Sequence, residues 1–178
     1  ILKKLKNLKI IFSLGAGVDH ILKLPSYKNT PIIRIQDPNM RSRMLNHVLA
    51  QILIYQLKLT EYNKAQQKNI WLDERHTSLN KDLTIGVLGV GYLGKFIANK
   101  LKSLDYNVIG YKNTISSVKY SIPIYYKKSL KTFLKLSDII VSVLPATKET
   151  RDLINKSFLN QMKKKSLLIN IGRGSSLN

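Results

Sequence analysis

The chain has 178 residues, of which 44% are hydrophobic and 22% charged, a composition typical of a folded globular protein and not of a disordered one. Its 30 Lys and Arg against 10 Asp and Glu give a formal charge of +20, which raises nucleic acid or an anionic membrane as partners. Cysteine is absent, which excludes disulfides and thiolate metal sites and favours a reducing, cytoplasmic location.

The positive charge has a simpler explanation than nucleic-acid binding. Nearly all of it is lysine, and the chain is also rich in Asn and Ile. These residues share A/T-rich codons, whereas phosphate recognition more often uses Arg. The longest apolar run, 48–59, is interrupted by two glutamines and is too short to span a bilayer. We therefore predict neither a nucleic-acid nor a membrane partner. His20, His47 and His76 lie far apart, so we expect no metal site.

The first part of the chain predicts a βαβ-like pattern followed by a long helical segment. Apolar runs and turn residues predict strand 8–13, helix 18–24 and strand 31–35. From Met40 to about Asn69 there is neither Gly nor Pro, and apolar residues recur at helical spacing, which predicts one long helix or two abutting helices. His47 falls on this segment and is expected to be packed or partly buried. The polar, aperiodic residues 71–81 predict a domain boundary.

The second part alternates strands and helices. We expect strands over 83–88, 107–111, near 124, 138–144 and 166–171, with helices over 92–104, 130–136 and 156–162, the second of them capped by Ser129. This alternation predicts an α/β fold with a Rossmann-type doubly wound parallel sheet.

A glycine fingerprint follows the first strand of that sheet. Gly89, Gly91 and Gly94 stand in GxGxxG spacing between a predicted strand and a predicted helix, the context in which this motif indicates dinucleotide binding. Gly89 would permit the tight turn, Gly91 the approach of a pyrophosphate, and Gly94 close packing of helix on strand. The pyrophosphate would lie on the amides of the helix start, at Tyr92 and Leu93. The alternative is that this spacing arises by chance and the motif is only a structural turn.

The end of the next strand bears on the choice of cofactor. NAD sites usually place an acid there for the ribose hydroxyls, but this sequence has Lys112 and Asn113. Lys112 could pair with a 2′-phosphate, so we favour NADP(H) over NAD(H). In so lysine-rich a chain, Lys112 is alternatively an incidental surface residue.

Five segments in a fixed order make the function more specific. They are SLGAGVDHIL (13–22), NHVLAQIL (46–53), GVLGVGYLGKFIANKL (86–101), LPATKETRDLIN (144–155) and FLNQMKKKSLLINIGRGSSLN (158–178). With them the chain resembles the D-isomer-specific 2-hydroxyacid dehydrogenases, and within that family the glyoxylate/hydroxypyruvate reductase type.

The resemblance implies a two-domain oxidoreductase that forms homodimers and transfers hydride between NAD(P)H and a small 2-keto or 2-hydroxy acid. It implies that residues 1–40 are the C-terminal part of a flavodoxin-like substrate domain, 41–81 a connecting helix and linker, and 82–178 an incomplete Rossmann domain. The family's catalytic acid and His would lie beyond Asn178, so this polypeptide alone is expected to bind cofactor weakly and to turn over nothing.

The resemblance also assigns site residues. In the resembled family, the loop that contains Ala16 and Gly17 binds the substrate carboxylate through exposed amides. A plain strand-to-helix turn would explain these small residues equally well. Arg173 follows the last strand, and its guanidinium can bind a carboxylate bidentately and polarise the keto oxygen; the alternative is an Arg paired with a local acid. The remaining cofactor residues are Leu144, Pro145, Thr150 and Ile171, with Thr150 alternatively capping a turn.

Two other functions remain open from the sequence. A non-catalytic dinucleotide-binding regulator of the same superfamily would share the fold, because fold does not imply function. Arg173 and the Gly17 turn argue against it, since a pure sensor needs no carboxylate pocket. A nucleic-acid binder is the third candidate and would show strongly salt-dependent affinity.

Overall fold

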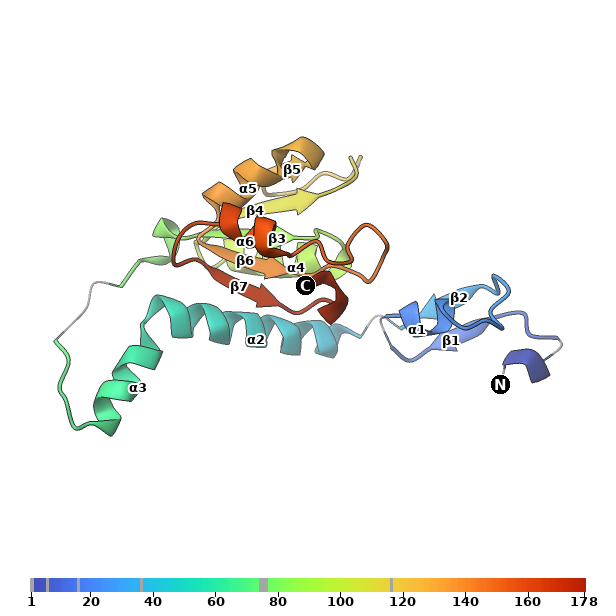
Figure 1. Ribbon diagram of the computed structural model, residues 1–178, viewed down its shortest axis with the longest axis horizontal. Coiled ribbons are helices and arrows are strands. Elements are labelled where there is room, and N and C mark those ends of the chain that lie inside the picture. The colour runs from blue at the N-terminus through green and yellow to red at the C-terminus, as the bar shows by residue number, and fades with distance from the viewer. Residues whose placement is uncertain (1, 6, 16, 36, 74–76, 116) are drawn as a thin grey trace.

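The computed structural model describes residues 2–5, 7–15, 17–35, 37–73, 77–115 and 117–178. A small unit at the N-terminus holds η1 (Leu2–Lys4), β1 (Ile11–Ser13), α1 (Asp19–Leu22) and β2 (Ile32–Arg34). β1 and β2 pair in parallel, with Ile11 opposite Ile32. The unit lies beyond the N-terminal end of α2 and projects from the rest of the chain (Figure 1). The predicted βαβ-like order of this part is confirmed, with shorter elements than expected.

Two abutting helices follow, α2 (Pro38–Gln56) and α3 (Leu59–Gln67). The Asp37 carboxylate caps α2 by accepting from the amide of Asn39 at 2.8 Å. The helices separate at Lys58, whose φ of 57° is left-handed and ends the first helix as an αL residue does. Neither Gly nor Pro marks this break, so the sequence left the choice between one helix and two open.

α2 packs on the core of the second part of the chain through a narrow apolar stripe. Leu45, Val48 and Ile52 are buried, and they join the cluster formed by the neighbouring sheet and helix α4. The expectation that His47 is packed or partly buried is wrong: the side chain is exposed, because it precedes Val48 by one position and so points away from the stripe.

The second part forms a five-stranded parallel sheet in the order β5-β4-β3-β6-β7. Its elements are η2 (Asn80–Asp82), β3 (Thr84–Leu88), α4 (Tyr92–Lys102), β4 (Asn107–Lys112), β5 (Ile124–Tyr126), η3 (Lys127–Ser129), α5 (Leu130–Leu136), β6 (Ile139–Ser142), α6 (Lys156–Gln161), β7 (Leu167–Asn170) and η4 (Gly174–Ser176). The strand order reverses between β3 and β6, as it does in a doubly wound sheet. The predicted Rossmann-type fold is confirmed.

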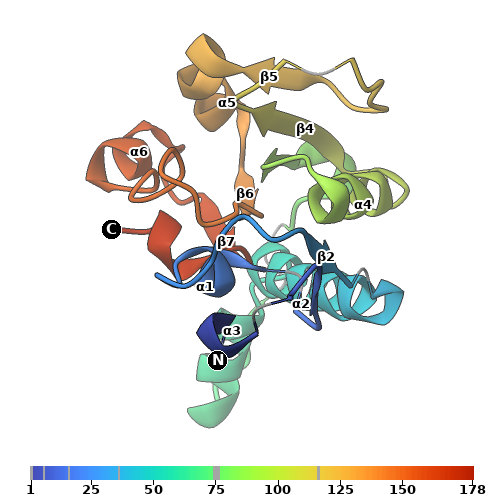
Figure 2. The same cartoon turned by 90° about the vertical axis from the view of Figure 1, so that its right-hand side faces the viewer.

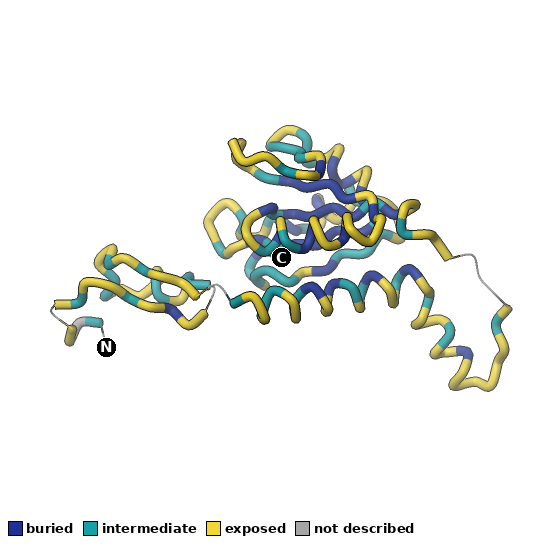
Figure 3. The backbone as a smooth tube through the Cα atoms, turned by 180° about the vertical axis from the view of Figure 1, so that it is seen from behind, coloured by how far each residue is buried: buried dark blue, intermediate teal, exposed yellow. Residues whose placement is uncertain are grey.

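Helices cover both faces of the sheet (Figures 1 and 2). On one face, Ile85, Val87 and Val141 of the strands pack against residues of α2 and α4. On the other, Phe133 of α5 and Phe158 of α6 pack with strand residues that alternate with the first set. Both faces of the central strands are therefore apolar, as expected for a parallel sheet. Burial is concentrated there, whereas α3 and the N-terminal unit are mostly exposed (Figure 3).

Two helix starts differ in how they are capped. Asn155 caps α6 by accepting from the amide of Phe158 at 3.1 Å. Ser129 lies at the start of α5 as predicted, but within the described structure its side chain makes no capping hydrogen bond, because a 3-10 turn over 127–129 leads into the helix. Across the ranges that the structure describes, none of the helices has the length and apolar character needed to cross a membrane.

Candidate functional site

The predicted cofactor loop lies at the carboxyl end of the central strand β3, next to the point where the strand order reverses. Ligands of open α/β sheets bind at this place, outside the carboxyl ends of the strands. The loop leads directly into α4, which begins at Tyr92. Its first-turn amides, including those of Tyr92 and Leu93, have no acceptor inside the helix and can donate to an anion.

Each of the three glycines has a different spatial requirement. Gly89 has a φ of 100°, which L side chains rarely adopt. A Cβ on Gly94 would lie 2.1 Å from the carbonyl oxygen of Gly89, so only glycine lets α4 pack this closely on the strand. A Cβ on Gly91 meets no described atom within 4 Å, which leaves room for a phosphate beside the backbone. These residues therefore fit a dinucleotide pyrophosphate.

A cationic cluster stands at the end of β4, where the cofactor preference was predicted to be decided. The Nζ of Lys112 donates to the hydroxyl of Tyr120 at 2.7 Å. The ammonium groups of Lys112 and Lys95 lie 5.3 and 5.7 Å from the centre of the Tyr120 ring. Asn113 is exposed at the same strand end. Lys95 and Tyr120 were not foreseen, because they come from α4 and from the loop before β5.

The loop after β6 carries Leu144, Pro145 and Thr150. Leu144 is buried and Pro145 is exposed. The Thr150 hydroxyl donates to the carbonyl of Pro145 at 2.5 Å and accepts from the amide of Thr147 at 2.9 Å. These bonds are those of a turn cap, so they favour the structural alternative for Thr150; its contact with a cofactor stays a prediction.

The end of β7 is held against the end of β6. The amide of Ile171 donates to the carbonyl of Ser142 at 3.0 Å, and a Cβ on Gly172 would lie 2.6 Å from the carbonyl oxygen of Leu144. The carbonyl of Arg173 accepts from the Ser176 hydroxyl at 2.7 Å and from the Asn170 amide group at 3.3 Å. The backbone of Arg173 is therefore fixed at this edge of the sheet.

The structure brings Arg173 together with Gly17 of the N-terminal unit. A Cβ on Gly17 would lie 1.4 Å from the Nη2 atom of Arg173, so the guanidinium rests where a side chain would otherwise be. The Nε of Arg173 donates to the Oδ1 of Asp19 at 3.1 Å. α1 thus lies beside the segment that follows β7 (Figure 2). Ala16, the other predicted substrate residue, lies outside the described residues.

The ion pair shifts the titration of its acid. A hydrogen bond from the Arg173 side chain is the largest cause that lowers the pKa of Asp19 below its ordinary 3.8, and the charges of Arg173 and Lys23 act in the same direction. Asp19 is therefore ionised at neutral pH. The sequence offered no signal for this pairing, because 154 positions separate the two residues.

Arg41, which the sequence analysis did not single out, links α2 to α4. The Nη1 of Arg41 donates to the Tyr92 hydroxyl at 3.0 Å. Its guanidinium carbon lies 4.5 Å from the ring centre of Phe96, within the range of a cation–π contact. The side chain thereby joins the start of α2 to the first two turns of α4.

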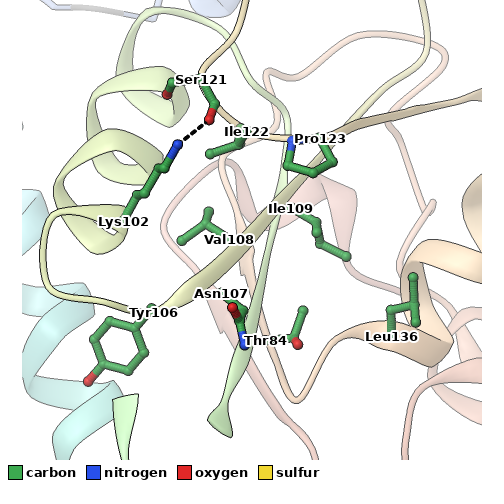
Figure 4. Close-up of a pocket in the computed structure, with 10 residues that line it drawn as sticks. All are labelled: Thr84, Lys102, Tyr106, Asn107, Val108, Ile109, Ser121, Ile122, Pro123 and Leu136. Atoms are coloured by element: carbon green, nitrogen blue, oxygen red, sulfur yellow. Dashed lines mark hydrogen bonds between the residues drawn. The ribbon is translucent and has the colours of Figure 1, made fainter. Parts of the chain in front are cut away.

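A separate pocket of about 360 Å³ opens at the other end of the sheet. It is lined by Thr84, Lys102, Tyr106, Asn107, Val108, Ile109, Ser121, Ile122, Pro123 and Leu136, and Lys102 closes one side by donating to the Ser121 carbonyl at 2.5 Å (Figure 4). Thr84 and Asn107 begin their strands, so this pocket is remote from the glycine loop. Among the described residues, no group of three or more His, Asp or Glu could hold a metal ion.

Comparisons with known proteins agree with this geometry. Residues 49–178 match the model of the "D-isomer specific 2-hydroxyacid dehydrogenase, NAD binding domain" family. The chain is 34% identical over 177 residues to glyoxylate/hydroxypyruvate reductase A of Photorhabdus laumondii, covering 96% of this chain and 56% of the relative. The Yersinia enterocolitica reductase A is 32% identical over 179 residues, with the same shares covered. The chain spans about half the length of the curated relatives it matches.

Solved structures are similar over the whole chain. The NADPH-dependent glyoxylate/hydroxypyruvate reductase of Sinorhizobium meliloti, in complex with NADP and sulfate, superposes with a TM-score of 0.90 at 30% identity, covering 100% of this chain and 58% of that one. A D-isomer specific 2-hydroxyacid dehydrogenase of Xanthobacter autotrophicus, in complex with NADPH and MES, gives 0.92 at 30% identity, covering 99% and 56%.

Proposed function

Because the chain belongs to the family of D-isomer specific 2-hydroxyacid dehydrogenases, we propose that its protein transfers hydride between NAD(P)H and a small 2-keto or 2-hydroxy acid such as glyoxylate or hydroxypyruvate. The observation that carries the proposal is the position of Arg173. A Cβ on Gly17 would lie 1.4 Å from its Nη2 atom. Arg173 follows β7, which pairs with β6, and β6 pairs in turn with β3, the strand that leads into the glycine loop.

The chain's own residues divide the work between cofactor and substrate. The first-turn amides of α4, at Tyr92 and Leu93, hold the pyrophosphate, while Leu144, Pro145, Thr150 and Ile171 border the cofactor farther along the strand ends. The dinucleotide supplies the hydride when it is bound. Arg173 binds the substrate carboxylate and draws charge from the neighbouring oxygen, and the turn at Ala16 and Gly17 donates amides to it. In this proposal residues 1–40 belong to the substrate domain, 41–81 connect, and 82–178 form the nucleotide domain.

NADP(H) is the cofactor we propose over NAD(H). The support is the pair of lysines around Tyr120, with Lys112 and Asn113 where an NAD site usually has an acid. The relatives from Sinorhizobium and Xanthobacter were solved with NADP and NADPH. Two ammonium groups near one ring repel each other, and a 2′-phosphate would offset that repulsion.

Substitution of Lys112 tests the cofactor preference. In Lys112→Ala we expect calorimetric affinity for NADPH to fall about tenfold, the scale of one charged contact to phosphate, with NADH unchanged. Lys119→Ala, an exposed lysine of the same β4–β5 connection, removes the same charge and should leave both affinities unchanged. Equal losses for the two cofactors in Lys112→Ala would refute the assignment.

Binding of two ligands tests the function itself. We expect the chain to bind NADPH. We expect the NADPH-saturated chain to bind oxalate, a planar analogue of a 2-keto acid. Arg173→Lys should weaken oxalate binding, because lysine lacks the bidentate fork of the guanidinium. NADPH binding without Arg173-dependent oxalate binding would instead favour the non-catalytic regulator. Turnover is tested with the longest polypeptide that the source gene encodes, by following NADPH oxidation with hydroxypyruvate and with glyoxylate.

A homodimer belongs to the same proposal. Apolar side chains stand exposed along α2, α3 and the following segment: Leu53, Ile54, Leu57, Leu59, Ile70, Trp71 and Leu79. Trp71 is 90% exposed. Exposed apolar residues on neighbouring elements support association, and a second copy would bury them. The cytoplasmic location stays a prediction.

A further inference from the structure

The ion pair between Arg173 and Asp19 uses one edge of the guanidinium. Its Nε–H points to Oδ1 of Asp19 at 3.1 Å, and within the described structure Asp19 is the carboxylate that pairs with it. A guanidinium has five N–H donors, four of them on the two terminal nitrogens. The contact with Asp19 uses the inner nitrogen, so the terminal pair, Nη1 and Nη2, keeps the geometry that a planar carboxylate needs.

Asp19 is well placed to fix this geometry. It is the first residue of α1, two positions after Gly17, on which the guanidinium rests. Arg173 lies in the segment between β7 and η4, and its side chain is 42% exposed against 30% for Asp19. A long, half-exposed Arg side chain loses much rotamer freedom when it is ordered. A hydrogen bond at Nε orders this side chain before a ligand binds, so less entropy is lost on binding.

We propose that Asp19 is a positioning residue for Arg173, which turns the terminal edge of the guanidinium toward a bound 2-keto carboxylate; this rests on the proposed function. The assembled unit is Gly17, Asp19 and Arg173. Because Asp19 and Gly17 belong to the N-terminal unit and Arg173 to the nucleotide-binding sheet, the carboxylate site is complete only while the two units are in contact.

If Asp19 did not position Arg173, electrostatics alone would predict the opposite effect of its removal on anion binding. Removal of a carboxylate beside Arg173 adds one positive charge and should strengthen anion binding if Asp19 merely competes with the substrate. If Asp19 positions Arg173, its removal weakens binding, because a bidentate contact tolerates little misplacement.

The experiment measures oxalate affinity in the NADPH-saturated chain. Asp19→Ala is expected to weaken oxalate binding about tenfold, as misalignment of a positioning group does, while affinity for NADPH is unchanged. Asp19→Asn keeps the acceptor oxygen and is expected to restore most of the affinity. Asp73→Ala, which removes an exposed acid after α3, matches the charge change and should have no effect on either ligand.

A spectroscopic signature separates positioning from a general structural role. The Nε–Hε signal of Arg173 is identified among the six arginines by its loss in Arg173→Lys. We expect it to move toward the position of an unpaired Arg in Asp19→Ala and to stay near its original position in Asp19→Asn. Oxalate affinity that is equal or higher in Asp19→Ala, with NADPH still bound, overturns the role of Asp19 alone. Failure of the unsubstituted chain to bind NADPH or oxalate overturns the proposed function and this inference with it.

Discussion

The contact between Arg173 and Gly17 depends on the absence of one side-chain atom. A Cβ at position 17 would lie 1.4 Å from Nη2 and 2.6 Å from Cζ of Arg173, so in Gly17→Ala the guanidinium has to leave. We expect oxalate affinity to fall at least about tenfold, with NADPH affinity unchanged, as measured by calorimetry. Gly15→Ala is the matched control, because a Cβ on Gly15 would lie 3.6 Å from the nearest described atom, the carbonyl oxygen of Gly17. Oxalate binding that survives in Gly17→Ala would show that the guanidinium acts from another position.

At the scale of elements, the glycine loop and α4 separate a packing requirement from a binding requirement. A Cβ on Gly94 would lie 2.1 Å from a backbone oxygen, so Gly94→Ala should push α4 off the strand. We expect a loss of about 1–3 kcal/mol in the free energy of unfolding, the usual cost of overpacking, together with weaker NADPH binding. Gly91→Ala has open space in the described structure and should weaken NADPH binding alone. Urea unfolding measures the stability of both variants, and calorimetry measures their affinity for NADPH. An equal loss in the free energy of unfolding in Gly94→Ala and Gly91→Ala would contradict this division of roles.

α2 is joined to the start of the sheet through a buried amide. The side chain of Gln56 is 6% exposed, donates to the Ser78 carbonyl at 2.7 Å and to the Asn80 side chain at 2.9 Å, and accepts from the Tyr106 hydroxyl at 2.7 Å. Burial raises the pKa of Tyr106, so its hydroxyl keeps the proton and needs an acceptor.

Substitution of Gln56 should therefore leave several polar groups unsatisfied. We expect Gln56→Ala to lower the free energy of unfolding by about 1–3 kcal/mol, the cost of buried unpaired donors and acceptors, in urea denaturation. Gln66→Ala, on the exposed side of α3, should change it little. If Tyr106→Phe lowers the free energy of unfolding by the same amount in the Gln56→Ala variant as in the unsubstituted protein, the two residues do not interact.

The elements that the sequence predicted well are those whose signals are local. Strands 84–88 and 139–142 are continuous apolar runs, and the glycine loop is a spacing pattern, so neither needs information from elsewhere in the chain. The break at Lys58 depends on a left-handed residue that is neither Gly nor Asn, which no propensity marks. Within the candidate site, Arg173 and Lys112 were found by their place after strands, whereas their partners Asp19 and Tyr120 are fixed by tertiary packing.

At the scale of the whole molecule, the exposed apolar residues around Trp71 predict self-association. Trp71→Ser removes the largest of these apolar side chains. Because Trp71 is 90% exposed, the substitution should leave the free energy of unfolding of a monomer nearly unchanged. We expect sedimentation velocity to show a dimer for the unsubstituted protein and a shift toward monomer for Trp71→Ser. Leu104→Ser, an exposed apolar residue after α4, is the control and should keep the dimer. A monomer in both proteins at high concentration would contradict the proposed homodimer.

The contact between the two units of the chain should weaken only in acid. Arg173 lowers the pKa of Asp19 below 3.8, so the folded state holds this proton less tightly than the unfolded state does. The contribution of the ion pair is therefore fully present above pH 3.8 and is lost as the pH falls through the lower folded value. The Asp19 carboxyl carbon, followed by NMR, should titrate below 3.8 in the unsubstituted chain and return toward 3.8 in Arg173→Ala. Amide exchange of α1 should accelerate over the same interval in the unsubstituted chain. An Asp19 titration that is identical with and without Arg173 would mean that the two units are not joined by this pair in solution, and the carboxylate site would then require another source of order.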